Sequence, residues 1–343
     1  MTSKWQNVYN NPKNILSIND VQIDLIEEYN DGDTVPNEYT ILTYNIWGLS
    51  IDDNLKKLFS LRKDMLISTI LQANSDFVCL QEMSDYSYNE LTDVIQQYKY
   101  ASEKPYIKQI SRKRNADIFF MSRFKPSKIT IYGLPGILCY FNSMIVVEYI
   151  NLVIINVYLQ SGTKKSPGQA NSWKQFSECR SILLQFIYDI TKTFDNKNIV
   201  LCGDFNFHLD GTVQEWPEIN IINKFKLDGF IDTYKYVNPD NDGFTEDTDK
   251  NSLRWNLKLI DKKYKFDAIF YKSINQRNNN HSSTLVGFDT SYLNPENSIW
   301  FINKMSDACG DFDKLKNVIK INNDYLIPIN ASDHFGVLTT IRN

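Results

Sequence analysis

The sequence of 343 residues is poor in histidine and cysteine and has no excess of positive charge. Three histidines and five cysteines, without a Cys-x-x-Cys spacing, argue against a zinc site and against a disulfide framework. No apolar run has the length of a transmembrane helix, and the polar start of the chain lacks the apolar region of a signal peptide. We therefore expect a soluble intracellular protein without stable membrane association.

The formal net charge of −4 does not indicate that the chain as a whole binds nucleic acid. A nucleic-acid enzyme would need a locally basic surface, because neutralisation of phosphates supplies much of the affinity. The candidates for such a surface form two groups, although a solvated loop is the more common role of such charges. They are Lys108, Arg112, Lys113 and Arg114 in the first group and Lys258, Lys262, Lys263 and Lys265 in the second.

Apolar and aromatic residues are abundant, with 42% hydrophobic residues, 20 Tyr and 20 Phe, which is enough for a sizeable core. Residues 1–38 are polar with little periodicity, and we expect an N-terminal extension there. From residue 39 onward strand-like and helix-like patterns alternate, which predicts one domain over residues 39–343. A long insertion is expected within it at about residues 275–327.

Short apolar runs predict buried strands, and apolar residues at helical spacing predict amphipathic helices. The strands are expected at 39–44, 76–80, 117–121, 142–148, 152–159, 198–202 and 337–341, and the helices at 55–73 and 173–194.

Polar side chains stand at one end of four of these strand-like runs. In chain order they are Asn45, Glu82, the pair Asp204 and Asn206, and the pair Asp333 and His334. Acid, amide and imidazole groups at strand ends are what a site needs to orient water, hold a metal ion and stabilise a phosphate. Each fragment alone is weak evidence, because Gly-Asp-x-Asn or Ser-Asp-His arises often by chance.

The order and context of these fragments resemble the endonuclease/exonuclease/phosphatase superfamily, which has the deoxyribonuclease I-like fold. The resemblance implies an α/β protein, a four-layer sandwich of two mixed β-sheets flanked by helices. It also implies a metal-dependent phosphoric ester hydrolase with its site where the strand ends of both halves converge.

The same resemblance assigns roles to the strand-end residues. Glu82 would be the principal Mg²⁺ ligand, helped by Asp333 and Asn45, with Mn²⁺ as a substitute. Magnesium suits this set because it binds a few carboxylates and retains several waters. Asp204 would orient or deprotonate the attacking water, and Asn206 would hold that water and a phosphate oxygen. Asn45 would also contact the phosphate.

His334 would stabilise the charge of the transition state, and Asp267, in the run Phe266–Phe270, would hold its imidazole. Lys265 stands where the family usually has Arg. Tyr158 occupies a position where many members have His, whereas apurinic/apyrimidinic endonucleases have a Tyr that contacts the phosphate. Tyr158 thus keeps a phosphate donor but removes a possible general acid, which disfavours the lipid-cleaving branch.

The segment Thr245–Leu253 is similar to a stretch of the 5′-tyrosyl-DNA phosphodiesterases, with Glu246 in place of their Trp. The favoured function is therefore a monomeric, magnesium-dependent phosphodiesterase acting on nucleic acid, most simply DNA. It would be a repair endonuclease or exonuclease, or an enzyme that removes adducts from 5′ ends. Two alternatives remain: a non-catalytic binding module, and a phosphoinositide phosphatase or sphingomyelinase. The lipid enzymes would need an exposed aromatic and basic hairpin, of which the sequence gives no clear sign.

Overall fold

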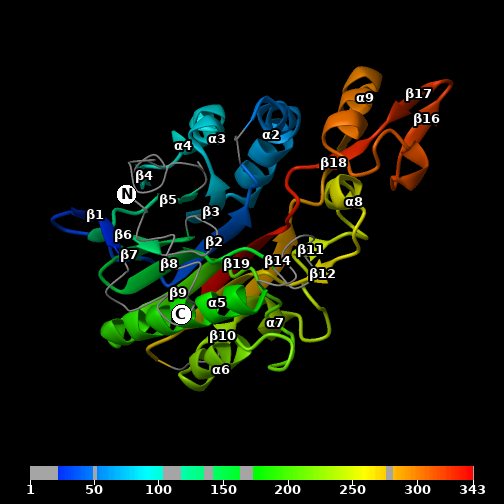
Figure 1. The fold of residues 1–343 in the computed structure, drawn as a ribbon. Helices are drawn as coiled ribbons and strands as arrows, with labels where there is room; N and C mark the ends of the chain where they lie inside the picture. Colours follow the sequence, from blue (N-terminus) through cyan, green and yellow to red (C-terminus); the bar gives the residue numbers. More distant parts are fainter. Residues whose placement is uncertain are drawn as a thin grey trace, which may run out of the picture.

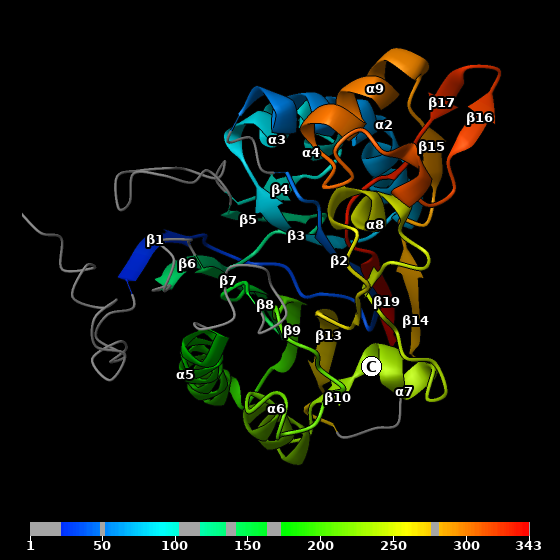
Figure 2. The ribbon, with the colours of Figure 1, turned by 45° about the vertical axis from the view of Figure 1, so that its right-hand side comes forward.

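Two β-sheets lie face to face, and helices cover the outer face of each (Figures 1 and 2). This computed structural model confirms the expected four-layer α/β sandwich. The structure describes residues 22–48, 52–102, 117–134, 142–162, 173–275 and 281–342. No helix within these ranges is both long and apolar enough to span a bilayer.

Among the described residues the first sheet has seven strands. Its centre is formed by β8 and β9, which run parallel with every residue buried. Such unbroken apolar runs occur where both faces of a sheet are covered. In sheet order the strands are β1 (Gln22–Glu28), β6 (Lys128–Leu134), β7 (Asn142–Glu148), β8 (Leu152–Tyr158), β9 (Asn198–Asp204), β13 (Asp267–Lys272) and β10 (Ile231–Asp232).

The second sheet has six strands, with β2 and β3 parallel at its centre. In sheet order they are β14 (Ser282–Val286), β19 (Gly336–Arg342), β2 (Glu38–Asn45), β3 (Phe77–Met83), β5 (Asp117–Ser122) and β4 (Tyr100–Ala101). Apolar side chains from both sheets fill the space between them. Polar contacts also cross this core, among them the one from Gln81 Nε2 on β3 to Asn156 Oδ1 on β8 at 2.8 Å.

A separate layer of helices covers the outer face of each sheet (Figure 2). Those on the second sheet are α2 (Asp53–Ala73), α3 (Asp85–Glu90) and α4 (Thr92–Ile95). Those on the first are α5 (Trp173–Thr191), its 3₁₀ continuation η3 (Lys192–Phe194) and α6 (Ile219–Leu227), while α7 (Thr233–Val237) follows β10. The long helices match the expected ranges. Helix α2 begins at the N-cap Asp52, whose side chain accepts from the Leu55 amide, and ends at Asn74 in the left-handed conformation.

Part of the expected N-terminal extension belongs to the first sheet. Residues 22–28 form β1, which pairs with β6 at the edge, and Val35 is buried in the core between the sheets. The extension therefore cannot reach to residue 38. Its alternating, acidic sequence is a weak strand signal, as is usual for an edge strand. Residues 1–21 lie outside the described residues.

The expected insertion at 275–327 also begins too early, because β14 at its start is a strand of the second sheet, paired with β19. The chain after β14 forms a lobe, which packs with a segment after α7 on one side of the sandwich (Figure 1). The segment contains β11 (Glu246–Asp247), α8 (Ser252–Lys258) and β12 (Lys263–Tyr264). The lobe contains β15 (Thr290–Tyr292), α9 (Pro295–Lys304), η4 (Phe312–Lys314), β16 (Ile319–Ile321), β17 (Asp324–Leu326) and β18 (Pro328–Asn330).

Gly203, near the end of β9, allows β8 and β9 to approach closely, and a larger residue at this position should destabilise the protein. Its φ is +138°, and a Cβ there would lie 2.0 Å from the Val157 carbonyl oxygen. Gly203→Ala should destabilise the protein by about 3 kcal/mol or more, through backbone strain and this clash. Gly229→Ala is the matched control, since its φ is +91° but a Cβ meets nothing within 4 Å.

For Gly229→Ala we expect a loss of about 1 kcal/mol from backbone strain alone. Urea unfolding followed by circular dichroism measures both variants. Equal losses in the two variants would contradict the steric account of Gly203.

Candidate active site

The strand ends of both sheets meet at one edge of the sandwich, and the pairing registers bring the expected site residues together. Asp204 ends β9, where it stands opposite Tyr158 of parallel β8 and opposite Asp267 of antiparallel β13. From the second sheet, Asn45 ends β2 beside the end of β3, which carries Glu82.

Asn45 joins the two sheets at this edge. Its fully buried side-chain amide donates to Asp204 Oδ2 at 2.9 Å and to Glu82 Oε1 at 3.2 Å. Its own Oδ1 accepts from the Trp47 amide at 2.9 Å, and its backbone carbonyl accepts from Ser332 Oγ at 2.7 Å. Because both N–H groups of the amide are used, Asn45 orients the two carboxylates in this state.

Glu82 has one carboxylate oxygen engaged and one without a partner. Oε1 accepts from Tyr158 Oη at 2.8 Å as well as from Asn45. Oε2 is buried and has no hydrogen-bond partner among the described residues. Burial raises the pKa of Glu82, and the charge of nearby Asp333 raises it further. A buried oxygen without a partner beside a second acid is suited to a bound cation.

Asp204 is fully buried and held by three N–H groups from two asparagines. Besides Asn45, the Asn206 backbone donates to Oδ1 at 2.8 Å and the Asn206 amide to Oδ2 at 3.2 Å. The same Asn206 amide donates to the Leu159 carbonyl at 2.9 Å. Both Asn206 amide hydrogens are therefore engaged within the protein, so Asn206 positions Asp204 here instead of offering a hydrogen to a phosphate oxygen. Burial raises the pKa of Asp204 well above its ordinary value, with Asp267 adding to the rise.

His334 and Asp267 form the expected pair, with His334 Nδ1 at 2.8 Å from Asp267 Oδ2. Burial alone would lower the pKa of His334, but the adjacent Asp267 carboxylate raises it well above the ordinary value, which favours the imidazolium. Thr245 Oγ1 accepts from the amides of Phe266 and Asp267 and so fixes the start of β13.

Two groups of side chains are candidates for a metal site. Asp204, Asp267 and His334 place one ligand atom each within 4.8 Å of one another. Their inward atoms are largely committed to the hydrogen bonds described above, although Asp267 Oδ1 is buried without a partner among the described residues. Glu82, with Asp333 nearby, offers the free Oε2 and an all-oxygen donor set, which suits a hard cation such as Mg²⁺ better.

Three residues at this site have a strained backbone conformation. Glu82, Asn206 and Trp47 have φ values of 56°, 57° and 45° without being glycine. At Glu82 the register between β3 and β5 also shifts, so that the chain bulges where the carboxylate must turn inward. Such conformations cost free energy and persist only where surrounding contacts hold them.

Arg62 of α2 supplies part of that restraint and was not expected from the sequence. The buried guanidinium donates to the carbonyls of Ile46 at 2.8 Å, Ala331 and Trp47. It thereby ties the segment after Asn45 to the segment before Asp333. Burial lowers the pKa of Arg62 to about 10, although Asp333 counteracts the effect. The one feature of the sequence that could have indicated this role is a basic residue on the apolar face of α2.

The second basic group of the sequence is not a free cationic surface. Lys265 is buried and pairs with Asp232 and, at 3.5 Å, with Asp210. The others pair as Lys258 with Asp307 at 3.6 Å, Lys262 with Glu246 at 3.3 Å and Lys263 with Asp249 at 2.5 Å. The first basic group, at positions 108–114, lies outside the described residues.

Removing the Arg62 guanidinium should destabilise the fold. Arg62→Met leaves three carbonyls near the site without their donor, and we expect a loss of about 3 kcal/mol or more in urea unfolding. Arg62→Lys, which keeps a donor, should recover part of this loss. Arg123→Met removes an exposed pair with Asp76 and should cost less than about 1 kcal/mol. A loss in Arg62→Met no larger than in this control would refute the restraint.

Similar solved structures share the fold at low sequence identity. Truncated TDP2 from Caenorhabditis elegans is 17% identical, with a TM-score of 0.56, over 89% of this chain and 98% of that one. TDP2 from D. rerio, complexed with a single-strand DNA product, is 16% identical with a TM-score of 0.57, over 88% and 98%. Sphingomyelinase C from Streptomyces griseocarneus is 12% identical with a TM-score of 0.59, over 89% and 99%.

The match to a protein-family model assigns this chain to a family. It describes the endonuclease/exonuclease/phosphatase family and matches residues 42–275, which is most of the chain. A comparison with curated proteins finds no match. The matched range contains Asn45, Glu82, Asp204 and Asp267, whose convergence is described above, and the fold agrees with the resemblance seen in the motifs. The chain belongs to the endonuclease/exonuclease/phosphatase family of metal-dependent phosphoric ester hydrolases.

Proposed function

We propose that this protein is a magnesium-dependent phosphodiesterase that hydrolyses phosphodiester bonds at DNA ends. The observation that carries the proposal is the convergence of Asp204, the His334–Asp267 pair and the free Glu82 carboxylate oxygen in one buried site. A base, a cationic hydrogen-bond donor and a cation site are the three elements that water attack on phosphorus requires.

In this proposal Asp204 accepts a proton from the attacking water. Its carboxylate is held by Asn45 and by both amides of Asn206, so its orientation is fixed before substrate binds. The water oxygen forms the new bond to phosphorus while the bond to the leaving oxygen breaks.

His334 is placed to stabilise the charge that develops on the phosphoryl oxygens. Asp267 holds the ring through Nδ1, which leaves Nε2 as the donor toward the substrate. Tyr158 donates to Glu82 in this state, so its expected contact with the phosphate requires that this hydrogen bond be exchanged when substrate binds.

A magnesium ion would be held by Glu82 Oε2, with Asp333 and the Asn45 side chain nearby. Such an ion, when bound, polarises a phosphoryl oxygen and neutralises part of its charge. The residues fit this role because the buried Oε2 has no partner among the described residues and because the donors are oxygen atoms.

Two features support nucleic acid as the substrate. Thr245–Leu253, the segment similar to 5′-tyrosyl-DNA phosphodiesterases, lies against the site, since the Phe335 amide donates to the Thr245 carbonyl at 2.7 Å. Among the structural neighbours, a TDP2 structure contains a single-strand DNA product. DNA repair would be the corresponding role.

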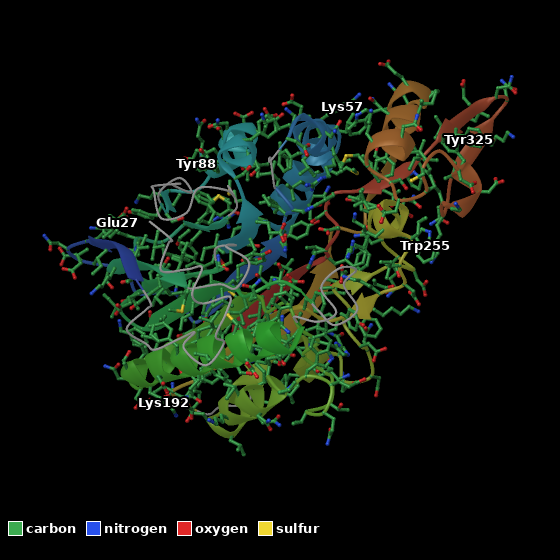
Figure 3. All side chains as sticks on the ribbon, viewed as in Figure 1. Glu27, Lys57, Tyr88, Lys192, Trp255 and Tyr325 are labelled. Carbon is green, nitrogen blue, oxygen red and sulfur yellow. The ribbon has the colours of Figure 1, made fainter. Side chains whose placement is uncertain are left out.

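A lipid phosphodiesterase is the second candidate, and one structural feature favours it. Strands β16 and β17 form a hairpin at the periphery of the lobe (Figure 1), with Ile319 and Ile321 40% and 52% exposed on either side of Lys320. Tyr325 lies in the same hairpin (Figure 3). The sequence alone shows no clear sign of this hairpin, and its aromatic residue Tyr325 is half-buried and stacks on Phe312. Sphingomyelinases are also among the structural neighbours.

A substrate panel distinguishes the two candidates. It comprises 5′-tyrosyl DNA, an abasic duplex, plain single-stranded DNA, a phosphoinositide and sphingomyelin, each with and without magnesium. Hydrolysis of a DNA substrate with no turnover of either lipid is the expected result. Turnover of a lipid alone would transfer the assignment to the second candidate.

Activity should depend on a divalent cation bound at Glu82. Glu82→Gln should reduce turnover at least about a hundredfold and weaken Mn²⁺ binding in calorimetric titration, because a formal charge and a strong oxygen ligand are lost. Glu38→Gln, which removes an exposed acid paired with Arg342, is the control. Full activity in excess chelator would exclude the proposed role of the cation.

Asp204 and His334 should serve the same transition state. Asp204→Asn and His334→Ala should each lower kcat by roughly a hundredfold or more. Their double variant should lose less than the product of the two single losses, because neither group acts fully without the other. Steady-state rates on the best substrate of the panel measure this, and a wild-type rate in either single variant would place the chemistry elsewhere.

A further inference from the structure

A charged cluster of three side chains lies next to the active site and has no part in the chemistry described above. It consists of Glu246 on β11, Arg254 on α8 and Lys262 just before β12. Arg254 Nε contacts Glu246 Oε1, and Lys262 Nζ lies 3.3 Å from the same oxygen. The side chains are only 3%, 14% and 10% exposed, in that order. Two cations share one acid, so the cluster carries a net charge of +1.

Backbone contacts attach this cluster to the catalytic segment. Asn251, the N-cap of α8, accepts from the Arg254 amide at 2.9 Å and donates from its side chain to the Ser332 carbonyl at 2.8 Å. The segment after Ser332 carries Asp333 and His334. The beginning of α8 is therefore held beside the catalytic imidazole, and Trp255 in Figure 3 marks this helix.

The electrostatics agree with this placement. Burial alone would lower the pKa of Arg254, but Glu246 and then Asp333 raise it above its ordinary value. Burial would likewise raise the pKa of Glu246, whereas Arg254, Lys262 and also His334 bring it down to about 2. Burial lowers the pKa of Lys262, and the Glu246 carboxylate works against that shift. Arg254 thus stays charged, and both side chains interact electrostatically with Asp333 of the active site.

The geometry of the Arg254 contact leaves its best phosphate donors available. Arg254 meets Glu246 through Nε alone, so the two terminal amino groups of the guanidinium are not used by any contact found within the described residues. An arginine that only stabilises a carboxylate typically engages it with two parallel hydrogen bonds. The second oxygen of Glu246 is instead buried without a partner in that same part of the chain.

A purely structural role accounts poorly for this arrangement. Two largely buried cations share one carboxylate oxygen, and the further negative charges that act on Arg254 are those of Asp333 and Glu82, at the proposed cation site. A metal ion held by those two acids would leave the positive charge of the cluster to be balanced by an anion.

We propose that Arg254 and Lys262 bind the second phosphate of a single-stranded nucleic acid whose terminal phosphate occupies the catalytic site. The inference rests on the proposed function, and it adds that the enzyme prefers substrates with a phosphate next to the scissile one. Arginine supplies the planar fork for a phosphodiester, and lysine adds a point charge. Glu246 holds both cations in place while no substrate is bound.

Binding of two small ligands tests this directly. Thymidine 5′-monophosphate, pT, has one phosphate, and the dinucleotide pTpT adds a neighbouring phosphodiester. Calorimetry with the full-length chain carrying Asp204→Asn, in magnesium, avoids turnover. We expect pTpT to bind at least about tenfold more tightly than pT, as one charge-assisted contact typically provides.

Arg254→Met in the same background should lower the affinity for pTpT about tenfold and that for pT less than about twofold. Lys262→Met should act in the same direction with a smaller effect. Lys263→Met is the matched control, because Lys263 pairs with Asp249 outside the cluster and should leave both affinities unchanged. Thermal midpoints recorded alongside identify any variant that fails to fold, and Arg254→Lys, which keeps the charge, should then retain part of the pTpT preference.

Three results would overturn the inference: equal wild-type affinity for pT and pTpT, equal loss for both ligands in Arg254→Met, or tighter binding of inositol 1,4-bisphosphate than of pTpT. The second would mean that Arg254 only positions Asp333 and Glu82. Failure of the proposed function is a separate observation, since it would appear as absence of DNA hydrolysis in the wild-type chain, whereas this test measures a ratio of affinities.

Discussion

The hydrogen bond from Asn45 to Asp204 links the last residue of β2, in one sheet, to the last residue of β9, in the other. Both residues are fully buried, so the bond forms only when the sheets pack in the correct register. The core contact between Gln81 and Asn156 crosses the same interface one step deeper. The same Asn45 amide also donates to Glu82. The proposed cation ligand Glu82 and the proposed base Asp204 are therefore both oriented by one side chain.

Hydrogen bonds from neighbouring side chains hold the strained backbone at the site. Glu82 and Asn206 adopt positive φ, and in this conformation Glu82 accepts from Asn45 and Tyr158 while Asn206 donates to Asp204. Arg62 holds the carbonyls on both sides of the site, and Ser332 binds the Asn45 carbonyl. The rigid sandwich thus holds a set of acids whose mutual repulsion would otherwise separate them. A bound cation and a phosphate would balance each other at this position.

Residues placed by a continuous strand could be predicted from the sequence. Asp204 follows an apolar run in which every residue is buried, and the register of β9 then fixes its neighbours Tyr158 and Asp267. Other long-range partners could not be predicted. Arg62 meets a carbonyl 269 residues away, and Asn251, which caps the start of α8 near the Arg254 cluster, donates to the Ser332 carbonyl. Strand β1 was missed because an acidic edge strand carries little hydrophobic pattern.

The central claim is that the cation binds on the Glu82 side, which leaves Asp204 and His334 to act on the water and the phosphate. The alternative donor group of Asp204, Asp267 and His334 is close enough to hold an ion as well. Crystals of the protein soaked in Mn²⁺ distinguish the two by anomalous diffraction. The account predicts one anomalous peak in contact with Glu82 Oε2, and a peak between Asp204, Asp267 and His334 instead would contradict it.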